Sequence, residues 1–192
     1  MTVRLIVVVA LSGTLCVAFN PMVHATDDHD KHNAPVGLLK AVREATRDFR
    51  DVRVAMAAGY ASLGFCVTGP ERGAMGVHYA NSALVGDGVL DASTPELLIY
   101  EQHGSQLFFV GVEFLVLADQ WDASRPGGEP PVLMGQDFQV VGTPNRFRLP
   151  AFHELHVWAW KDNRFGTFVD WNPDVSCADF NPNGSTHRGR SF

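Results

Sequence analysis

Six short apolar or aromatic runs occupy the second two thirds of the chain, and they constrain its fold more than any other feature. They cover residues 74–79, 97–100, 107–117, 138–141, 151–160 and 166–171. Clusters of Gly, Pro, Asn and Asp, such as VGDGVLDAST and SRPGGEPP, separate them. Short runs bounded by turn residues are typical of β-strands, so this part of the chain is predicted to form a sheet.

Residues 34–60 show helical periodicity instead. Pro35 suits a first helical turn, and Gly59 lies where a helix would end. The apolar positions of this segment recur at spacings of three and four and form one stripe: Val42, Ala45, Phe49, Val52 and Met56. One helix followed by many strands predicts an α+β fold, in which an N-terminal amphipathic helix packs on an antiparallel β-sheet or half-open barrel.

The first 25 residues have the pattern of a signal peptide. Arg4 precedes an apolar run from Leu5 to Phe19, and Val23 and Ala25 occupy the third-last and last positions before a cleavage site after Ala25. The run is shorter than the ~20 residues of a membrane-spanning helix. We therefore predict a secreted or periplasmic protein without stable membrane insertion after cleavage; an uncleaved anchor is the alternative.

The mature chain is predicted to consist of a disordered polar N-terminus, residues 26–33, and a single domain, residues 34–192. The formal net charge of the whole chain is −6 at pH 7, and no basic stripe is present to neutralise phosphates. Nucleic acid is therefore excluded as a partner. The sequence does not indicate an oligomeric state.

Two cysteines, Cys66 and Cys177, remain after the predicted cleavage. An even pair in an exported protein normally forms a disulfide bond. The alternative is a pair of thiolate metal ligands, which the sequence disfavours because neither cysteine has a second Cys or His at ligand spacing.

The stretch LPAFHELHVWAWKDN concentrates polar residues within an apolar run. His153 and His156 are three residues apart, so the helical HExxH zinc signature, which needs a spacing of four, is absent. In a strand, side chains alternate between faces, so Glu154 and His156 share one face and His153 points to the other.

Two further strand-like stretches carry single polar residues of the same kind. GAMGVHYAN contains His78, and FFVGVEFLV contains Glu113 among apolar neighbours. Two imidazoles and a carboxylate form the ligand set of many zinc and non-haem iron centres. We predict a buried metal site formed by His78, Glu113 and His156, with Glu154 as a fourth ligand. Zinc or copper is expected first, then manganese or iron, since export disfavours labile iron(II).

Several alternatives stay open at this point. The same residues can form a buried hydrogen-bond network, or Glu113 can pair with Arg146 or Arg148. A metal centre can belong to a metal-dependent hydrolase or oxidase, with Glu101 or Glu154 as the base. A non-catalytic module that binds a small ligand or a partner is the third function that the sequence allows, so it leaves open whether the protein is an enzyme.

An ordered set of motifs resembles a family of small exported bacterial proteins. It comprises AAGYASLGFCV, MGVHYANSALVGDGVLD, PELLIYE, VGVEFLV and LPAFHELHVWAWKDNRFGTFVDWNPDVSC, and it extends from about Ala34 to Cys177. The resemblance implies a single secreted domain with both cysteines inside the shared region. The polar positions that it includes are His78, Glu101, Glu113 and His156, and it implies no catalytic role for any of them.

Overall fold

The structure is a computed structural model that describes residues 29–69, 71–125 and 128–182. The predicted signal peptide, residues 1–25, and the first three residues of the predicted polar N-terminus lie outside these ranges. In the described part of the chain, no helix is long and apolar enough to cross a membrane.

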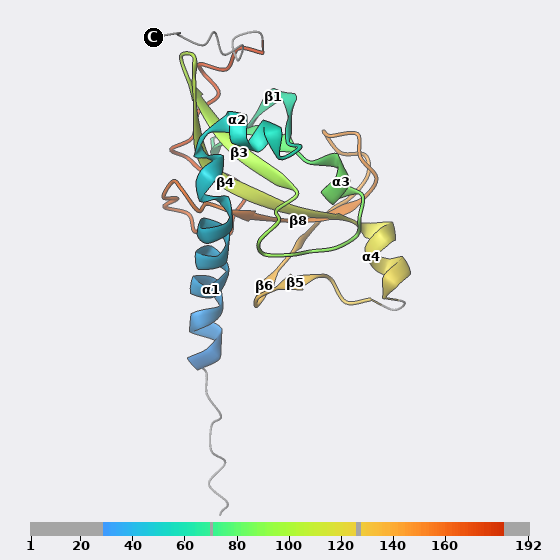
Figure 1. The fold of residues 1–192 in the computed structure, drawn as a ribbon. Coiled ribbons are helices and arrows are strands. Elements are labelled where there is room, and N and C mark those ends of the chain that lie inside the picture. Colours follow the sequence, from blue (N-terminus) through green and yellow to red (C-terminus); the bar gives the residue numbers. More distant parts are fainter. Residues whose placement is uncertain (1–28, 70, 126–127, 183–192) are drawn as a thin grey trace, which may run out of the picture.

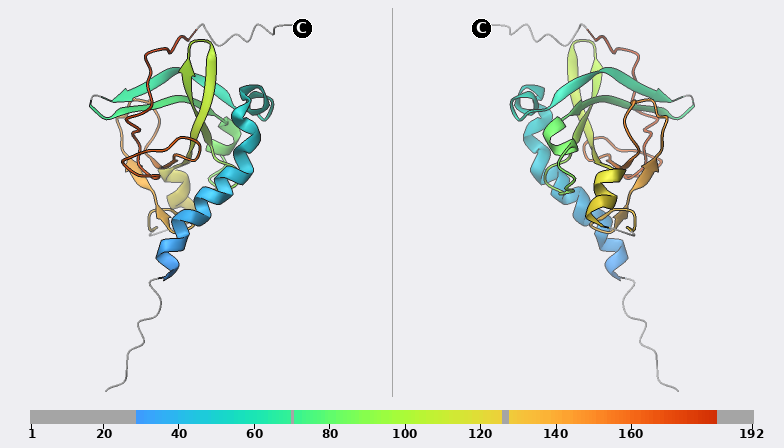
Figure 2. Two further views of the ribbon diagram at one scale, coloured as in Figure 1. Left: turned by 90° about the vertical axis from the view of Figure 1, so that its left-hand side faces the viewer. Right: turned by 90° about the vertical axis from the view of Figure 1, so that its right-hand side faces the viewer.

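A six-stranded antiparallel sheet forms the centre of the fold, and it curves as a half-barrel (Figures 1 and 2). The α+β class with an antiparallel half-open sheet is therefore confirmed. A separate two-stranded hairpin lies beside it. The sheet runs in the order β1 (Ala61–Gly69), β2 (Gly73–Ala80), β3 (Leu97–His103), β4 (Gln106–Leu117), β8 (Phe152–Val157) and β7 (Gln139–Val141), and the hairpin comprises β5 (Val132–Leu133) and β6 (Gln136–Asp137).

Three consecutive elements occupy the region predicted as one helix: α1 (His29–Thr46), the 3₁₀ turn η1 (Arg47–Arg50) and α2 (Val52–Ala57). The break falls at Asp51, which is extended and caps α2 by accepting a hydrogen bond from the backbone N of Arg53 at 2.9 Å. Met56 is 56% exposed, so it does not belong to the buried stripe. The described chain has two more short helices, α3 (Ser82–Val85) and α4 (Ala118–Ser124).

The two faces of the sheet have different surroundings. Leu38 and Val42 of α1 are fully buried against one face, where the main core forms. The sheet contributes alternate residues to this core, among them Val77, Tyr79, Val112, Phe114, Leu155 and Val157. The intervening residues of the same strands lie on the other face, around a smaller cluster of Leu97, Leu115 and Phe152.

Two of the predicted strands differ from the structure, and the strands β1, β5 and β6 were not predicted. β1 was not predicted, because its first residues lie exposed at a sheet edge and lack a regular apolar pattern. The strand predicted for 151–160 ends at Val157. The run 166–171 is not a strand but a turn-rich segment across Trp158, whose backbone N donates to Thr167 O at 3.0 Å and whose indole Nε1 donates to Val169 O at 2.6 Å.

Cys66 on β1 and Cys177 in the C-terminal segment have their Sγ atoms 2.01 Å apart, the length of a disulfide bond. This is the pair expected from the sequence. The bond ties the edge strand β1 to the last described segment of the chain. A disulfide sulfur has no thiolate charge to offer, so these cysteines are not metal ligands in this structure.

Candidate metal centre

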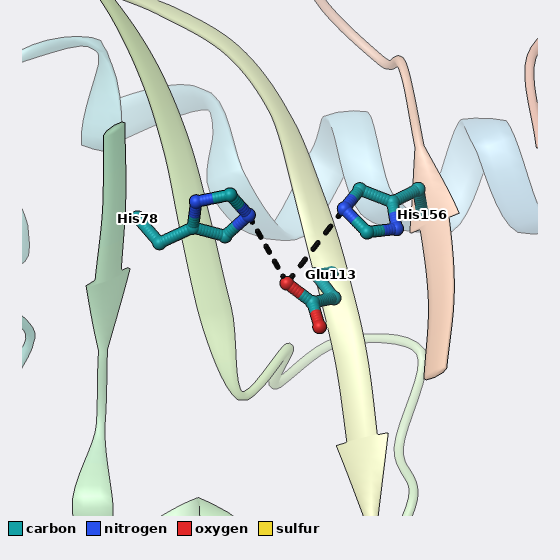
Figure 3. A group of neighbouring side chains, drawn as sticks. All are labelled: His78, Glu113 and His156. Carbon is teal, nitrogen blue, oxygen red and sulfur yellow. Dashed lines mark ion pairs between the residues drawn. The ribbon is translucent and has the colours of Figure 1, made fainter. Parts of the chain in front are cut away.

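Three strands bring His78, Glu113 and His156 together on the face of the sheet opposite α1 (Figure 3). Glu113 of β4 and His156 of β8 are direct neighbours in the antiparallel register. His78 of β2 reaches them diagonally across β3, since it pairs with Ile99 whereas Glu113 pairs with Leu97. The alternation that sends Val77, Val112 and Leu155 into the main core therefore sends these three polar side chains to the other face.

The ligand atoms of the three side chains converge. The Nε2 atom of His78 lies 3.2 Å from Glu113 Oε2, and the Nε2 atom of His156 lies 3.7 Å from the same oxygen. All three potential ligand atoms lie within 4.8 Å of one another. Ligand atoms about 2.0–2.2 Å from a tetrahedral ion are about 3.3–3.6 Å apart, so this spacing suits one ion with little adjustment.

Neither imidazole has a hydrogen-bond partner. Both ring nitrogens of His78 and both of His156 are buried and unpaired, although Glu113 is close to each. The 3.2 Å contact of His78 fails as a hydrogen bond because its atoms are poorly aligned, not because they are distant. Buried polar atoms without partners are rare, and an ion between them would satisfy the two Nε2 atoms at once.

Burial also fixes the protonation of the two histidines. It lowers the pKa of His78 to about 4 and that of His156 to about 3, with the second ring adding to the effect on His156. Both rings are therefore neutral at pH 7, which is the form that coordinates a metal. The Gly76 carbonyl acts in the opposite direction and raises the pKa of His78, without meeting hydrogen-bond geometry with either nitrogen.

Glu113 has no cationic side chain beside it among the described residues. The suggested partner Arg146 instead donates to Thr68 O at 3.4 Å and lies over the ring of Trp171, and no ion pair joins Arg148 to Glu113. Burial raises the pKa of Glu113. A carboxylate that is 2% exposed and lacks a cation is costly, so Glu113 favours its neutral, protonated form unless a cation is bound beside it.

Glu154 lies on the same face of β8 as His156 and close enough to Glu113 to feel its charge. Burial, and then the charge of Glu113, raise the pKa of Glu154, because two neighbouring buried carboxyl groups without a cation cannot easily both be ionised. One oxygen of Glu154, Oε2, is buried without a partner. Glu154, predicted as the fourth ligand, is not among the residues whose potential ligand atoms converge with those of His78 and Glu113; it shares only His156 with that group.

Asp170 is a neighbour that the sequence did not single out. Its Oδ1 lies 3.6 Å from Nδ1 of His156 and accepts a hydrogen bond from the Gln139 amide. Asp170, Glu154 and His156 form a second group whose potential ligand atoms lie within 4.8 Å of one another. A carboxylate behind the distal nitrogen of a ligating histidine is a common orienting arrangement in metal sites. The only sequence signal was an acid between Val169 and Trp171.

Other polar residues named from the sequence lie elsewhere. His153 points to the opposite face of β8 from His156, as alternation requires, and belongs to neither group of ligand atoms in the described chain. Glu101 is buried, but it pairs with Lys161 Nζ at 2.5 Å and accepts from Ser176 N at 2.9 Å. Its lone pairs are occupied, so it is not available as a base for this centre.

An apolar pocket of about 150 Å³ adjoins the centre. Its walls are Leu97, Leu115, Phe147, Leu149 and Phe152, with Leu63 and Phe65 of β1 at its partly exposed rim. Of the lining residues that the structure describes, only Glu113 is polar.

Comparison with protein-family models, curated proteins and solved structures finds no match for this chain. The family resemblance drawn from its motifs therefore stays a prediction.

Proposed function

We propose that this is an exported protein that binds one transition-metal ion through His78, Glu113 and His156. The observation that carries the proposal is the convergence of two unpaired imidazole nitrogens on one carboxylate oxygen in a buried site. A structural hydrogen-bond network would use these atoms as donors and acceptors. Here the Nε2 atoms of His78 and His156 are close to Oε2 of Glu113 but are not aligned for hydrogen bonds. This arrangement is expected when the lone pairs of all three atoms point at one ion between them.

Zinc or copper fits the donor set best. Two neutral imidazoles and one carboxylate suit both ions, and manganese or iron would normally recruit more oxygen ligands. In a closed site Glu154 would supply the fourth ligand after losing its proton, whereas in an open site of three ligands that position would stay free for water or a small molecule. In both cases Asp170 would orient His156 from behind. The positive ion compensates the buried carboxylates, which have no Lys or Arg beside them in the described chain.

Export is supported by two independent features. The first 25 residues have the pattern of a signal peptide, and the Cys66–Cys177 pair lies at disulfide distance, which suits an oxidising compartment. The functional unit is then the single mature domain of residues 34–192.

A metal-dependent hydrolase or oxidase is the second candidate. It is favoured by the apolar pocket beside Glu113, which gives a small molecule access to the centre. With three protein ligands, the ion would keep a position for water or substrate, and Glu154, whose pKa is raised by burial and by the charge of Glu113, would be the candidate base. A closed site with Glu154 as the fourth ligand would bind metal without catalysis.

The metal content of the native protein tests the proposal. The protein is purified from the periplasm without a histidine tag and analysed by inductively coupled plasma mass spectrometry. We expect about one zinc or copper ion per chain, removal by a chelator, and recovery of one ion when zinc is added back. A protein that carries no stoichiometric metal, and whose metal-free form takes up none, would contradict the proposal.

A further inference from the structure

We infer that the pocket beside the metal centre binds the aromatic ring of a small aryl oxyanion, such as an aryl carboxylate or phenolate, whose oxygen coordinates the ion. This inference rests on the proposed metal site, because the ion provides the positive charge that such a ligand needs. It adds the chemical class of the ligand, which metal binding alone leaves undefined.

The size of the pocket indicates a single ring. A cavity of about 150 Å³ lined by aliphatic and aromatic side chains is large enough to stay dry and take up a benzene molecule. This pocket has the same volume and a similar lining, three phenylalanines and four leucines. A sugar or a nucleotide would find neither the room nor the hydrogen-bonding groups that its hydroxyls require.

The direction of the pocket indicates where the polar end of the ligand lies. Leu97 pairs with Glu113 in the β3–β4 register, and Leu115 follows on the same face of β4. Phe147 packs between the ring of Phe152, at 6.0 Å, and the imidazole of His78, at 6.5 Å. Glu113 is therefore the member of the centre that lines the pocket, and Phe147, another lining residue, lies beside the imidazole of His78. A ring held next to Glu113 would place its substituent at the centre.

The pocket lining itself does not attract an oxyanion, so the positive charge that would bind one has to come from the metal ion. Among the described residues, the pocket lining includes no Lys or Arg, and its one polar member is an acid. Without a metal it would repel an anion, and a purely apolar ligand would leave the open coordination position unused. An aromatic ring with one oxygen donor can pack its ring against the apolar walls and coordinate the ion through its oxygen.

The entrance lies at the edge strand β1. Leu63 is 40% exposed and Phe65 is 39% exposed, although both line the pocket. The ring of Phe65 lies 6.3 Å from that of Phe147, so these side chains separate the inner walls from solvent. A larger side chain at position 63 would fill the rim without disturbing the three proposed ligands.

Two matched probes test the inference on zinc-loaded full-length mature protein. Benzohydroxamate and acetohydroxamate carry the same metal-binding group and differ in a phenyl against a methyl group. Isothermal titration should show benzohydroxamate binding about 50-fold more tightly, from the apolar area of the ring. Zinc-free protein should bind neither probe.

Leu63→Trp should reduce the phenyl preference to about 3-fold or less with unchanged zinc stoichiometry, because the indole occupies the space of the ring. Val140→Trp is the matched control: Val140 is 61% exposed on β7, the opposite edge strand, and the preference should persist.

Each outcome separates the two proposals. Equal affinities for the two probes in a protein that holds zinc would overturn the aryl pocket and leave the metal site intact. A phenyl preference that survives Leu63→Trp, or that Val140→Trp abolishes equally, would overturn its location. A protein that takes up no metal would remove the proposed function, and this inference with it.

Discussion

Glu113 and His156 lie directly opposite each other in the β4–β8 pair, and Oε2 of the glutamate is 3.7 Å from Nε2 of the histidine. The imidazole of His78 approaches the same oxygen from the other side, at 3.2 Å. One carboxylate oxygen thus has two neutral rings beside it and no cationic side chain from the part of the chain that the structure describes.

His156→Ala and His153→Ala should behave differently although the two histidines are three residues apart on β8. His156→Ala should abolish stoichiometric metal, because it removes one of three converging ligands. His153→Ala should retain about one ion per chain, since its ring lies on the other face. Metal analysis of both purified variants is the measurement, and equal loss of metal in the two would contradict the site.

Glu113→Gln should lose the metal and yet stabilise the metal-free protein at alkaline pH. The amide keeps the shape of the carboxyl group and removes a buried negative charge, which we expect to raise the free energy of unfolding by about 1–2 kcal/mol at pH 9. The gain should vanish at pH 5, where burial keeps Glu113 protonated.

Urea denaturation of chelator-treated protein measures the effect of Glu113→Gln. Glu44→Gln, at a side chain that is 69% exposed, is the control and should change little. A Glu113→Gln variant that is less stable than wild type at pH 9 would indicate that the carboxylate already has a compensating partner.

The stability of the metal-free protein should fall as the pH rises from about 6.5 to 8. Burial raises the pKa of Glu96 to about 8 and also raises that of Glu113 and Glu154. The folded state then retains protons that the unfolded state has lost, so stability declines with pH. The histidines, whose pKa is lowered, act in the opposite direction only below about pH 6.5.

Zinc should oppose this decline, because the ion compensates the carboxylates that become charged. Urea titrations with and without zinc at constant ionic strength should therefore diverge as the pH rises. Parallel curves from pH 6.5 to 8 would show that zinc does not act at these acids.

Replacement of both cysteines by serine should cost about 4–5 kcal/mol of stability, as expected for a loop closed over a sequence separation of 111 residues. Thermal and urea unfolding of the double variant against the oxidised wild type give this value. Under conditions where the variant stays folded, it should still bind one ion. Loss of the ion from folded variant would instead point to thiolate ligation.

Phe49→Ala should lower the free energy of unfolding by about 2–3 kcal/mol, below the cost for a completely buried ring, because Phe49 is only partly buried. Its ring meets that of Tyr60 edge-on at 5.4 Å and packs against the main core. Met56→Ala is the control, since Met56 is 56% exposed and should change stability by less than about 0.5 kcal/mol. Equal effects would mean that Phe49 contributes no packing.

The polar members of the centre could be found from the sequence because each interrupts an alternating apolar strand. His78, Glu113 and His156 stand out between residues such as Val77, Val112 and Leu155, which the main core requires. Their convergence could not be derived, because it depends on the strand order β2-β3-β4-β8 and on a diagonal reach across β3.

Other features were hidden for identifiable reasons. The edge strand β1 begins with exposed residues that include Ser62 and Gly64, so no alternation marks it. Asp170 lies in a run that was predicted to be a strand because it contains apolar residues such as Phe168 and Trp171. In the structure this run is a turn-rich segment that passes across Trp158. Asp51 caps α2 and so divides the segment that was predicted as one helix. The apolar periodicity continues across Asp51, so the pattern alone could not reveal this break.

The three proposed ligands come from strands that are distant in sequence, and this has a consequence for when the ion is acquired. In an unfolded chain His78, Glu113 and His156 are separated by 34 and 42 residues, so these three do not form a chelate. The chelate forms only when β2, β4 and β8 pair. If the chain crosses a membrane unfolded, the proposed site would form only after transport, and the ions present in the compartment where it folds would decide which metal it takes.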